Sequence, residues 1–194
     1  VTSSNPVAGM ASVGVGIGPA HIDRVIGVVK AYTTRVGEGP FVSEMEPTLA
    51  GTVRERGGEY GVTTGRPRRI GWFDSVVTRH ARRVNGLTGL AITKLDILTG
   101  LSELQVCVGY RIDGRETRDM PASVSALERA EPIYERMPGW TQDLGGIRDL
   151  SQLPNNARAY VERIEALTGV PVALIGTGAD REDVIEMGEL LPAL

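Results

Sequence analysis

The chain has 194 residues, of which 41% are hydrophobic, enough to form one substantial core. Its formal net charge of −3 makes nucleic acid and anionic membrane surfaces unfavoured partners. The single cysteine, Cys107, excludes an internal disulfide, and no apolar run approaches the roughly 18 residues needed to cross a bilayer. We therefore expect a cytoplasmic protein that binds neither nucleic acid nor a membrane.

The N-terminal third predicts one helix and one long loop. Glycines 14, 16 and 18 precede Pro19 and a spaced apolar run, which predicts a helix over residues 19–31. The glycine run matches a dinucleotide-binding loop only weakly, because its third glycine is misplaced and no strong strand precedes it. Residues 33–69 are rich in Gly, Arg, Thr and Glu, and a loop of that length is typical of binding loops.

The middle of the chain predicts a helix and several strands. Asp74 is placed to cap a helix that Asn85-Gly86 would close. Residues 90–95 predict a buried strand. The next strand shows alternating apolar residues at Leu104, Val106, Val108 and Tyr110, and Asp113-Gly114 predicts a hairpin turn to its partner.

The C-terminal third predicts another helix and another strand. Apolar residues recur at helical spacing over 155–167 and stop at Gly169, and residues 170–175 form a buried apolar run. The whole pattern predicts an α/β fold, in which helices flank a mostly parallel sheet that carries a small β-hairpin element.

The strand at 90–95 runs into Thr93-Lys94-Leu95-Asp96, a pattern suited to recognising guanine. An Asp carboxylate can accept hydrogen bonds from the ring N1–H and the exocyclic amine, whereas adenine presents the wrong pattern. The Lys stem can lie along the base. The alternative is that Asp96 caps a following turn and Lys94 is solvated.

A second turn, Gly176-Thr177-Gly178, follows the last predicted strand. In a parallel sheet, two such turns gather at the carboxyl edge, where ligands bind. The glycines could leave backbone groups free to contact a base. An ordinary turn is the alternative.

The polar stretch "GVTTGRPRR", residues 61–69, suits a small ligand with two carboxylates. Thr63 and Thr64 offer hydroxyl groups, and Gly65 allows a ligand close to the backbone. Arg66 and Arg68 offer guanidinium groups that bind carboxylates through two parallel hydrogen bonds. A solvated basic loop is the alternative.

Other chemically active residues have no supporting context. His21 and His80 lack Asp, Glu or Cys at ligand spacing, which argues against a metal site or a catalytic triad. The sequence also contains no G-x-x-x-x-G-K-[ST] phosphate loop. A guanine-reading pattern is thus present without the element that usually holds the phosphates.

Several stretches together resemble adenylosuccinate synthetase, in the same order along the chain: "VTSSN", "KAYTTRVGEGPF", "GVTTGRPRRIGWFD", "TKLD", "EPIYERMPGW", "ERIEALTGVPV" and "GTGADR". The resemblance covers residues 1–181 and only the C-terminal part of that family. It implies that residues 1–194 are the C-terminal substrate- and guanine-binding portion of a single larger synthetase domain, with a P-loop-NTPase-like synthetase fold.

The resemblance also implies a function. The family is a cytoplasmic, homodimeric ligase of purine biosynthesis, which joins IMP to L-aspartate using GTP and Mg²⁺. Its phosphate loop, catalytic residues and metal ligands lie in the N-terminal half, so we expect no catalytic or metal-binding residue in this chain. On this interpretation the chain alone would be inactive.

Specific binding residues follow from matching the family's motifs. The resemblance assigns GTP contacts to Arg68, Lys94, Leu95, Asp96, Gly176, Thr177 and Gly178. It assigns aspartate and IMP contacts to Thr2, Val36, Val62, Thr63, Thr64, Gly65, Arg66 and Arg68. One departure affects the guanine side, because Ala179 stands where the family usually has proline.

Two other functions are alternatives. The chain could be a non-catalytic module that binds purine nucleotides or dicarboxylates, or a structural partner. A GTPase-like switch would need a phosphate loop and Mg²⁺ ligands within the chain, and the sequence offers neither.

Overall fold

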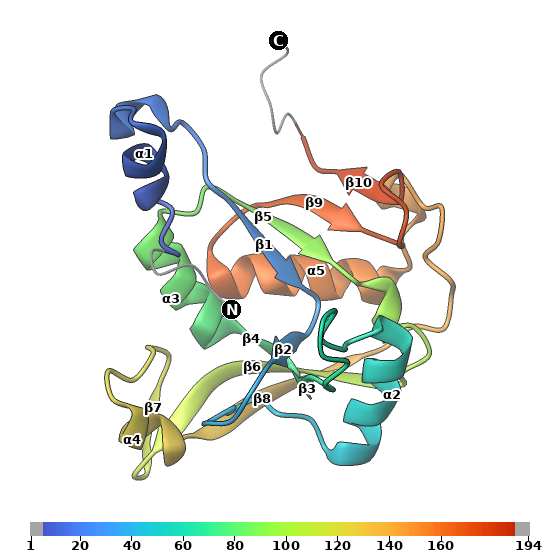
Figure 1. The fold of residues 1–194 in the computed structure, drawn as a ribbon. Helices are drawn as coiled ribbons and strands as arrows, with labels where there is room; N and C mark the ends of the chain where they lie inside the picture. The colour runs from blue at the N-terminus through green and yellow to red at the C-terminus, as the bar shows by residue number, and fades with distance from the viewer. Residues whose placement is uncertain (1–5, 189–194) are drawn as a thin grey trace.

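The computed structural model describes residues 6–188 and contains two four-stranded sheets (Figure 1). The first sheet has the order β1-β5-β9-β10. Strands β1 (Ile26–Lys30), β5 (Gly89–Thr93) and β9 (Val172–Gly176) run parallel, and β10 (Val184–Glu186) is antiparallel at the edge. The predicted α/β fold with a mainly parallel sheet is therefore confirmed.

The second sheet is built around the long strand β6 (Glu103–Ile112). It pairs in parallel with β4 (Phe73–Asp74) and antiparallel with β7 (Arg115–Thr117) and β8 (Glu131–Pro138). The predicted hairpin at Asp113-Gly114 is confirmed, and both residues have positive φ, at 49° and 80°. Such tight hairpin turns require positive φ because it matches the twist of the strands.

A third, two-stranded antiparallel sheet pairs β2 (Thr33–Arg35) with β3 (Arg69–Gly71). The helices are α1 (Met10–Val15), α2 (Pro47–Gly57), α3 (Ser75–Asn85), α4 (Val124–Glu128) and α5 (Asn155–Thr168). Short 3₁₀ turns cover Pro19–His21 (η1), Asp96–Leu98 (η2) and Leu150–Gln152 (η3). None of the described helices is long and apolar enough to cross a bilayer.

The two long helices predicted from caps and spacing are confirmed. The carboxylate of Asp74 accepts from the backbone N–H of Val76 at 2.9 Å, and α3 ends at Gly86 with φ of 64°. Helix α5 ends in the same way at Gly169. In each case the glycine adopts the left-handed conformation that closes a helix without a steric penalty.

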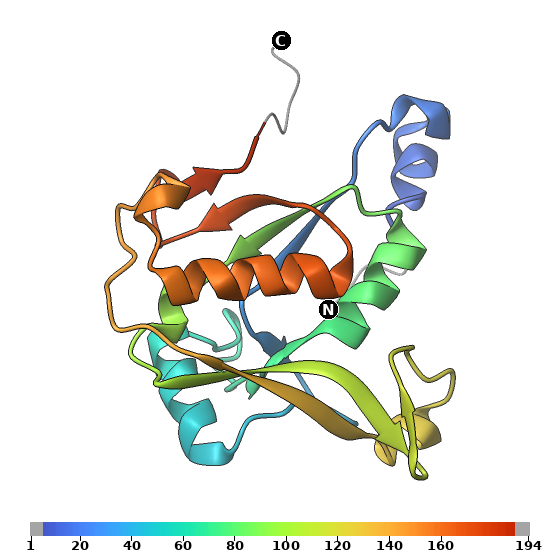
Figure 2. The same ribbon diagram turned by 180° about the vertical axis from the view of Figure 1, so that it is seen from behind.

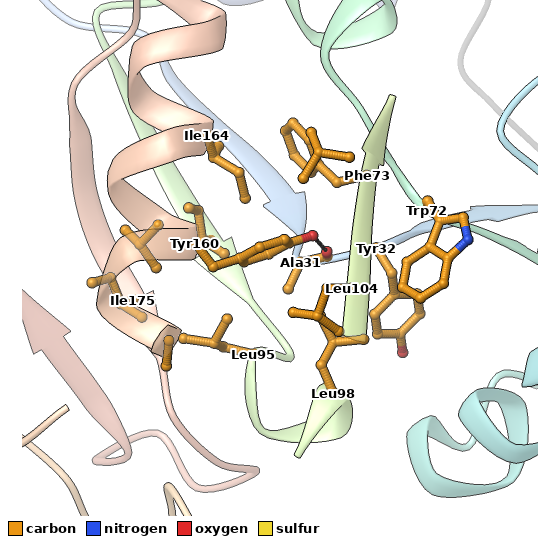
Figure 3. Packing of buried hydrophobic residues seen from close by; sticks show 14 of the residues in the cluster. Ala31, Tyr32, Trp72, Phe73, Leu95, Leu98, Leu104, Tyr160, Ile164 and Ile175 are labelled. Atoms are coloured by element: carbon orange, nitrogen blue, oxygen red, sulfur yellow. Dashed lines mark hydrogen bonds between the residues drawn. The ribbon is translucent and has the colours of Figure 1, made fainter. Parts of the chain in front are cut away.

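Helix α5 lies across one face of the first sheet, between it and the long strands β6 and β8 (Figures 1 and 2). Its fully buried Tyr160 reaches the end of β1, where the hydroxyl donates to the carbonyl of Ala31 at 2.7 Å (Figure 3). Leu95, which precedes η2, and Leu98, its last residue, are also fully buried in this core. The turn after β5 is thus anchored by its apolar side chains.

Two predictions for the N-terminal third are wrong. Residues 19–31 form only the turn η1 and the strand β1, because Val25–Val29 is rich in β-branched residues and pairs with β5. Residues 33–69 contain helix α2, capped by Glu46 and with Pro47 in its first turn. The sequence does not predict this helix, because its interior carries Gly51, Thr52 and several charges rather than a clear apolar stripe.

Candidate functional site

The two turns predicted to contact guanine lie side by side at the carboxyl edge of the first sheet. Strands β5 and β9 are adjacent and parallel, so the segments after Thr93 and after Gly176 leave the sheet at the same edge. A Cβ added to Gly176 would lie 3.5 Å from the Cα of Thr93 and 3.9 Å from the backbone nitrogen of Lys94. The backbones therefore approach closely, as predicted for two turns at the carboxyl edge of a parallel sheet.

The turn Gly176-Thr177-Gly178 is held in place by hydrogen bonds to residues 147 and 183. Thr177 is fully buried, and its hydroxyl donates to the carbonyl of Ile147 at 2.9 Å. Its backbone N–H donates to the carbonyl of Asp183 at 2.8 Å. A Cβ at Gly178 would lie 2.3 Å from a carboxylate oxygen of Asp183, so a larger residue there would displace the Asp183 side chain. The turn presents its backbone, since the hydroxyl of Thr177 is already used.

Asp96 opens η2 with its side chain half-buried. Burial raises the pKa of its carboxyl group, and hydrogen bonds from the backbone N–H groups of Asp96 and Ile97 act in the opposite direction. The cap residue of η2 is Leu95, which makes no side-chain capping bond. A half-buried carboxylate at this edge suits ligand recognition, because low local polarity strengthens its hydrogen bonds.

Lys94 is not simply solvated. Its φ of 59° lies in the left-handed region, which costs a non-glycine residue about 1–2 kcal/mol. Its ammonium group donates to the carbonyl of Gly57 at 2.5 Å and lies 3.3 Å from the carboxylate of Glu59. The strained backbone thus directs this side chain toward the segment that follows α2.

Glu59 is the centre of a cluster that sequence analysis missed. Its side chain is fully buried, and its carboxylate contacts two cations at 2.7 Å, Lys30 and Arg68. The hydroxyl of Tyr32 donates to it at 2.7 Å. We call Lys30, Tyr32, Glu59, Arg68 and Lys94 the Glu59 cluster. Its members come from distant parts of the chain, so no spacing in the sequence could reveal it.

The charge state of Glu59 follows from these contacts. Burial alone would raise the pKa of its carboxyl group. Hydrogen bonds from Lys30, Tyr32 and Arg68 outweigh burial and lower the pKa to about 2. Glu59 is therefore an anion throughout the physiological range.

The loop at residues 61–66 stands out from the surface. It is closed by two backbone hydrogen bonds, Gly61 N–H to Arg66 at 2.9 Å and Gly65 N–H to Gly61 at 2.8 Å. Residues 62–66 are exposed, and Val62 at the tip is 99% exposed. The guanidinium of Arg66 has no hydrogen-bond or ion-pair partner within residues 6–188, so it can bind an incoming anion.

The base of this loop joins the Glu59 cluster. The backbone N–H of Arg68 donates to the carbonyl of Glu59 at 3.0 Å, and Arg54 donates from Nε to the carbonyl of Arg68 at 2.8 Å. The side chain of Arg68 bonds to the Glu59 carboxylate. The structure therefore separates the two arginines that the sequence pattern grouped, because Arg66 is exposed and Arg68 is held.

Val36 lies on a neighbouring loop and is 70% exposed. Arg35 at the end of β2 pairs with Arg69 at the start of β3, so the loops after β2 and before β3 leave the same end of this small sheet. Arg35 holds its loop by donating to the carbonyls of Glu38 and Pro40 at 3.0 Å each. Thr2 lies outside the described residues.

Residues 6–188 contain no group of three or more His, Cys, Asp or Glu side chains that could hold a metal ion. His80 contacts Arg83 at 3.3 Å. Cys107 is buried in β6.

The lowered pKa of Glu59 predicts how stability depends on pH. A carboxyl group whose pKa falls on folding stabilises the folded state above its unfolded value near 4.5, and this contribution is lost as pH falls toward about 2. The difference in unfolding free energy between wild type and Glu59→Gln should be constant above about pH 5 and shrink below it. Urea unfolding across a pH series measures this difference. A difference that does not change with pH would contradict the assignment.

The sequence and the structure of this chain were compared with those of known proteins. The family profile described as adenylosuccinate synthetase matches residues 1–185. The chain is 56% identical over 185 residues to adenylosuccinate synthetase of Brevibacillus brevis, which covers 95% of this chain and 43% of the relative. It is 58% identical over 181 residues to the Listeria monocytogenes enzyme of the same name, which covers 93% of this chain and 42% of the relative.

A solved structure agrees. The fully ligated adenylosuccinate synthetase of Plasmodium falciparum superimposes with a TM-score of 0.92 at 37% identity, covering 96% of this chain and 45% of that one. The succinoaminodeoxyadenylate synthetase of cyanophage S-2L shares only the fold, with a TM-score of 0.51 at 18% identity. The chain spans less than half the length of these curated relatives. It belongs to the adenylosuccinate synthetase family.

Proposed function

We propose that this chain supplies the aspartate, IMP and guanine contacts of a GTP-dependent ligase that joins IMP and L-aspartate to form adenylosuccinate. One observation carries this proposal. The loop at 61–66 and the turn at 94–96, which sequence motifs assign to different substrates, meet through Arg68 and Lys94 on the single buried carboxylate of Glu59. GTP and aspartate act in successive steps on the same purine, so their binding segments need to be held in fixed positions relative to each other.

Aspartate would bind at the exposed loop. Arg66 offers an unpaired guanidinium, and Thr63 and Thr64 offer hydroxyl groups on the same loop, with Val62 and Gly65 beside them. A dicarboxylate has two anionic groups, and guanidinium groups bind carboxylates through two parallel hydrogen bonds. Arg68, at the base of the loop, is placed to interact with both aspartate and GTP. Thr2 and Val36 would contact IMP.

The guanine of GTP would bind at the carboxyl edge of the first sheet. Asp96 would accept from the base N1–H and exocyclic amine, and Lys94 would lie beside the ring. The backbone of Gly176, Thr177 and Gly178 would line the other side, with Leu95 fixing the turn from within the core. Ala179 follows this second turn directly.

Residues 1–194 would form the C-terminal portion of a single larger synthetase domain. In the reaction, GTP converts the purine oxygen into a phosphate leaving group, which the aspartate amine displaces. This chain would bind and orient the substrates. As the resemblance to the family implies, we place the ligands of Mg²⁺ and the catalytic residues in the remainder of the longer protein. The full-length enzyme would be a cytoplasmic homodimer.

Replacing Arg66 with Leu in the full-length protein should raise the KM for aspartate about tenfold, because one charge-assisted contact is lost. The KM for GTP should change little. The side chain of Arg66 makes no hydrogen bond or ion pair within residues 6–188, so the fold should be unaffected. Steady-state kinetics of adenylosuccinate formation measures both constants.

Arg136→Leu is the matched control, since this arginine is 72% exposed on β8 and pairs weakly with Glu103 at 3.6 Å. An unchanged aspartate KM in Arg66→Leu would contradict the loop assignment. Nucleotide binding without any ligation by the full-length protein would instead favour a non-catalytic binding module.

A further inference from the structure

We propose that Glu59 is a positioning residue that couples the aspartate loop to the guanine-binding turn. This inference rests on the proposed function. Glu59 would not touch either substrate. It would act by fixing Arg68 on one side and Lys94 on the other.

The carboxylate of Glu59 is fully occupied by its neighbours. Oε1 accepts from Lys30 and from Tyr32 at 2.7 Å each, and Lys94 lies 3.3 Å away. Oε2 accepts from Lys30 at 2.8 Å and from Arg68 at 2.7 Å. A carboxylate has about four lone-pair positions, so these contacts use its full accepting capacity. Water is excluded, because the side chain has no exposed surface.

The same short segment holds both sides through its backbone. The carbonyl of Glu59 accepts from Arg68 N–H, and the carbonyl of Gly57 accepts from the ammonium of Lys94. A Cβ at position 57 would lie 2.4 Å from the hydroxyl of Tyr32 and would displace the group that donates to Glu59. The positions of Arg68 and Lys94 therefore depend on one rigid segment at the end of α2.

The charges of the cluster do not cancel. One carboxylate faces the three cations Lys30, Arg68 and Lys94, so the cluster carries an excess of positive charge. Arg68 and Lys94 are still 28% and 36% exposed in their side chains, so an incoming anion can reach them. When one substrate anion attracts Arg68, the ion pair between Glu59 and Lys94 changes, and this links the binding of the two substrates.

This coupling gives a specific expectation for Glu59→Gln in the full-length protein. The amide preserves the shape but loses the negative charge and directs a donor at cations. The KM for aspartate and the KM for GTP should both rise roughly tenfold, as for loss of a hydrogen bond to a charged group. The KM for IMP should stay nearly constant. In wild type the aspartate KM should depend on the GTP concentration, and this dependence should disappear in Glu59→Gln.

Glu55→Gln is the matched control. Glu55 is an exposed glutamate one turn earlier on α2, and its carboxylate bonds to Tyr60 rather than to the cluster. Both KM values should be unchanged there. If Glu59→Gln fails to fold, the variant Tyr32→Phe tests the proposal instead. It removes one hydrogen bond to Glu59 while keeping every charge, and it should raise both KM values by a smaller factor.

Three results would overturn the proposal. The first is that the KM values of Glu59→Gln equal those of wild type. The second is that the KM for IMP rises as much as the KM values for aspartate and GTP, because such a uniform loss would indicate general misfolding. If Glu59→Gln does not fold, unchanged KM values in Tyr32→Phe would be equally decisive. The proposed function fails separately, if wild-type full-length protein forms no adenylosuccinate. That result is visible before any variant is made.

Discussion

Replacing Asp96 with Asn in the full-length protein is expected to weaken GTP binding roughly 10- to 100-fold and leave IMP binding nearly unchanged. The carboxylate can accept two hydrogen bonds from guanine, whereas the amide presents one acceptor and one misplaced donor. Hydrogen bonds to charged groups contribute about 1.5–3 kcal/mol each, which corresponds to a change of that size. The half-buried position of Asp96 adds to the effect, because burial limits replacement by water.

The measurement compares GTP with inosine triphosphate, whose base lacks the exocyclic amine. Wild type should prefer GTP, and Asp96→Asn should lose most of this preference. Asp113→Asn is the control, because Asp113 is an exposed aspartate on the β6–β7 hairpin, where it pairs with Arg129. An equal loss of GTP and IMP binding would show that Asp96 supports the fold rather than reading the base.

Local signals in the sequence predicted the parts of the fold that depend on neighbouring residues. The cap Asp74, the helix end at Gly86 and the turn Asp113-Gly114 are each defined within a few residues, and all are confirmed. Strand β1 was predicted as a helix because a short apolar run fits either structure. Its pairing with β5, more than 60 residues away in the chain, determines that this segment is a strand.

The same distinction applies to the candidate site. The turns after β5 and β9 could be placed together from sequence, because the carboxyl ends of parallel strands share an edge. Their roles in substrate binding stay predictions. Glu59 was not recognised, because its partners Lys30 and Lys94 lie 29 and 35 residues away in the chain and come together only in the folded structure. The strained backbone of Lys94 was equally invisible in the sequence.

The segment that carries Asp96 is supported by the end of β8. Gly139 N–H donates to the carbonyl of Ser102 at 2.9 Å, and Gly100 N–H donates to the carbonyl of Trp140 at 2.7 Å. The indole of Trp140 also donates to the hydroxyl of Thr99 at 3.0 Å. These bonds require the two backbones to approach closely, and a glycine at 139 permits this.

Gly139→Ala should therefore destabilise the protein by about 3 kcal/mol or more, at the upper end of the range for overpacking. The new Cβ would lie 1.8 Å from the carbonyl oxygen of Leu101 and 2.8 Å from its carbonyl carbon. These are backbone atoms of a fixed segment, so a side-chain rotation cannot relieve the clash. The melting temperature should fall by about 6–12 °C, as measured by calorimetry.

Gly51→Ala is a control variant that is expected to change stability in the opposite direction. Gly51 lies inside α2, and a Cβ there would meet nothing within 4 Å. Alanine restricts the unfolded chain and favours the helix, so this variant should be more stable by about 0.5–1 kcal/mol. In Gly139→Ala the residual folded protein should also bind GTP more weakly, because the displaced segment carries Asp96. If Gly139→Ala melts at the wild-type temperature, the close approach of β8 to residues 99–102 is wrong, and so is its role in fixing Asp96.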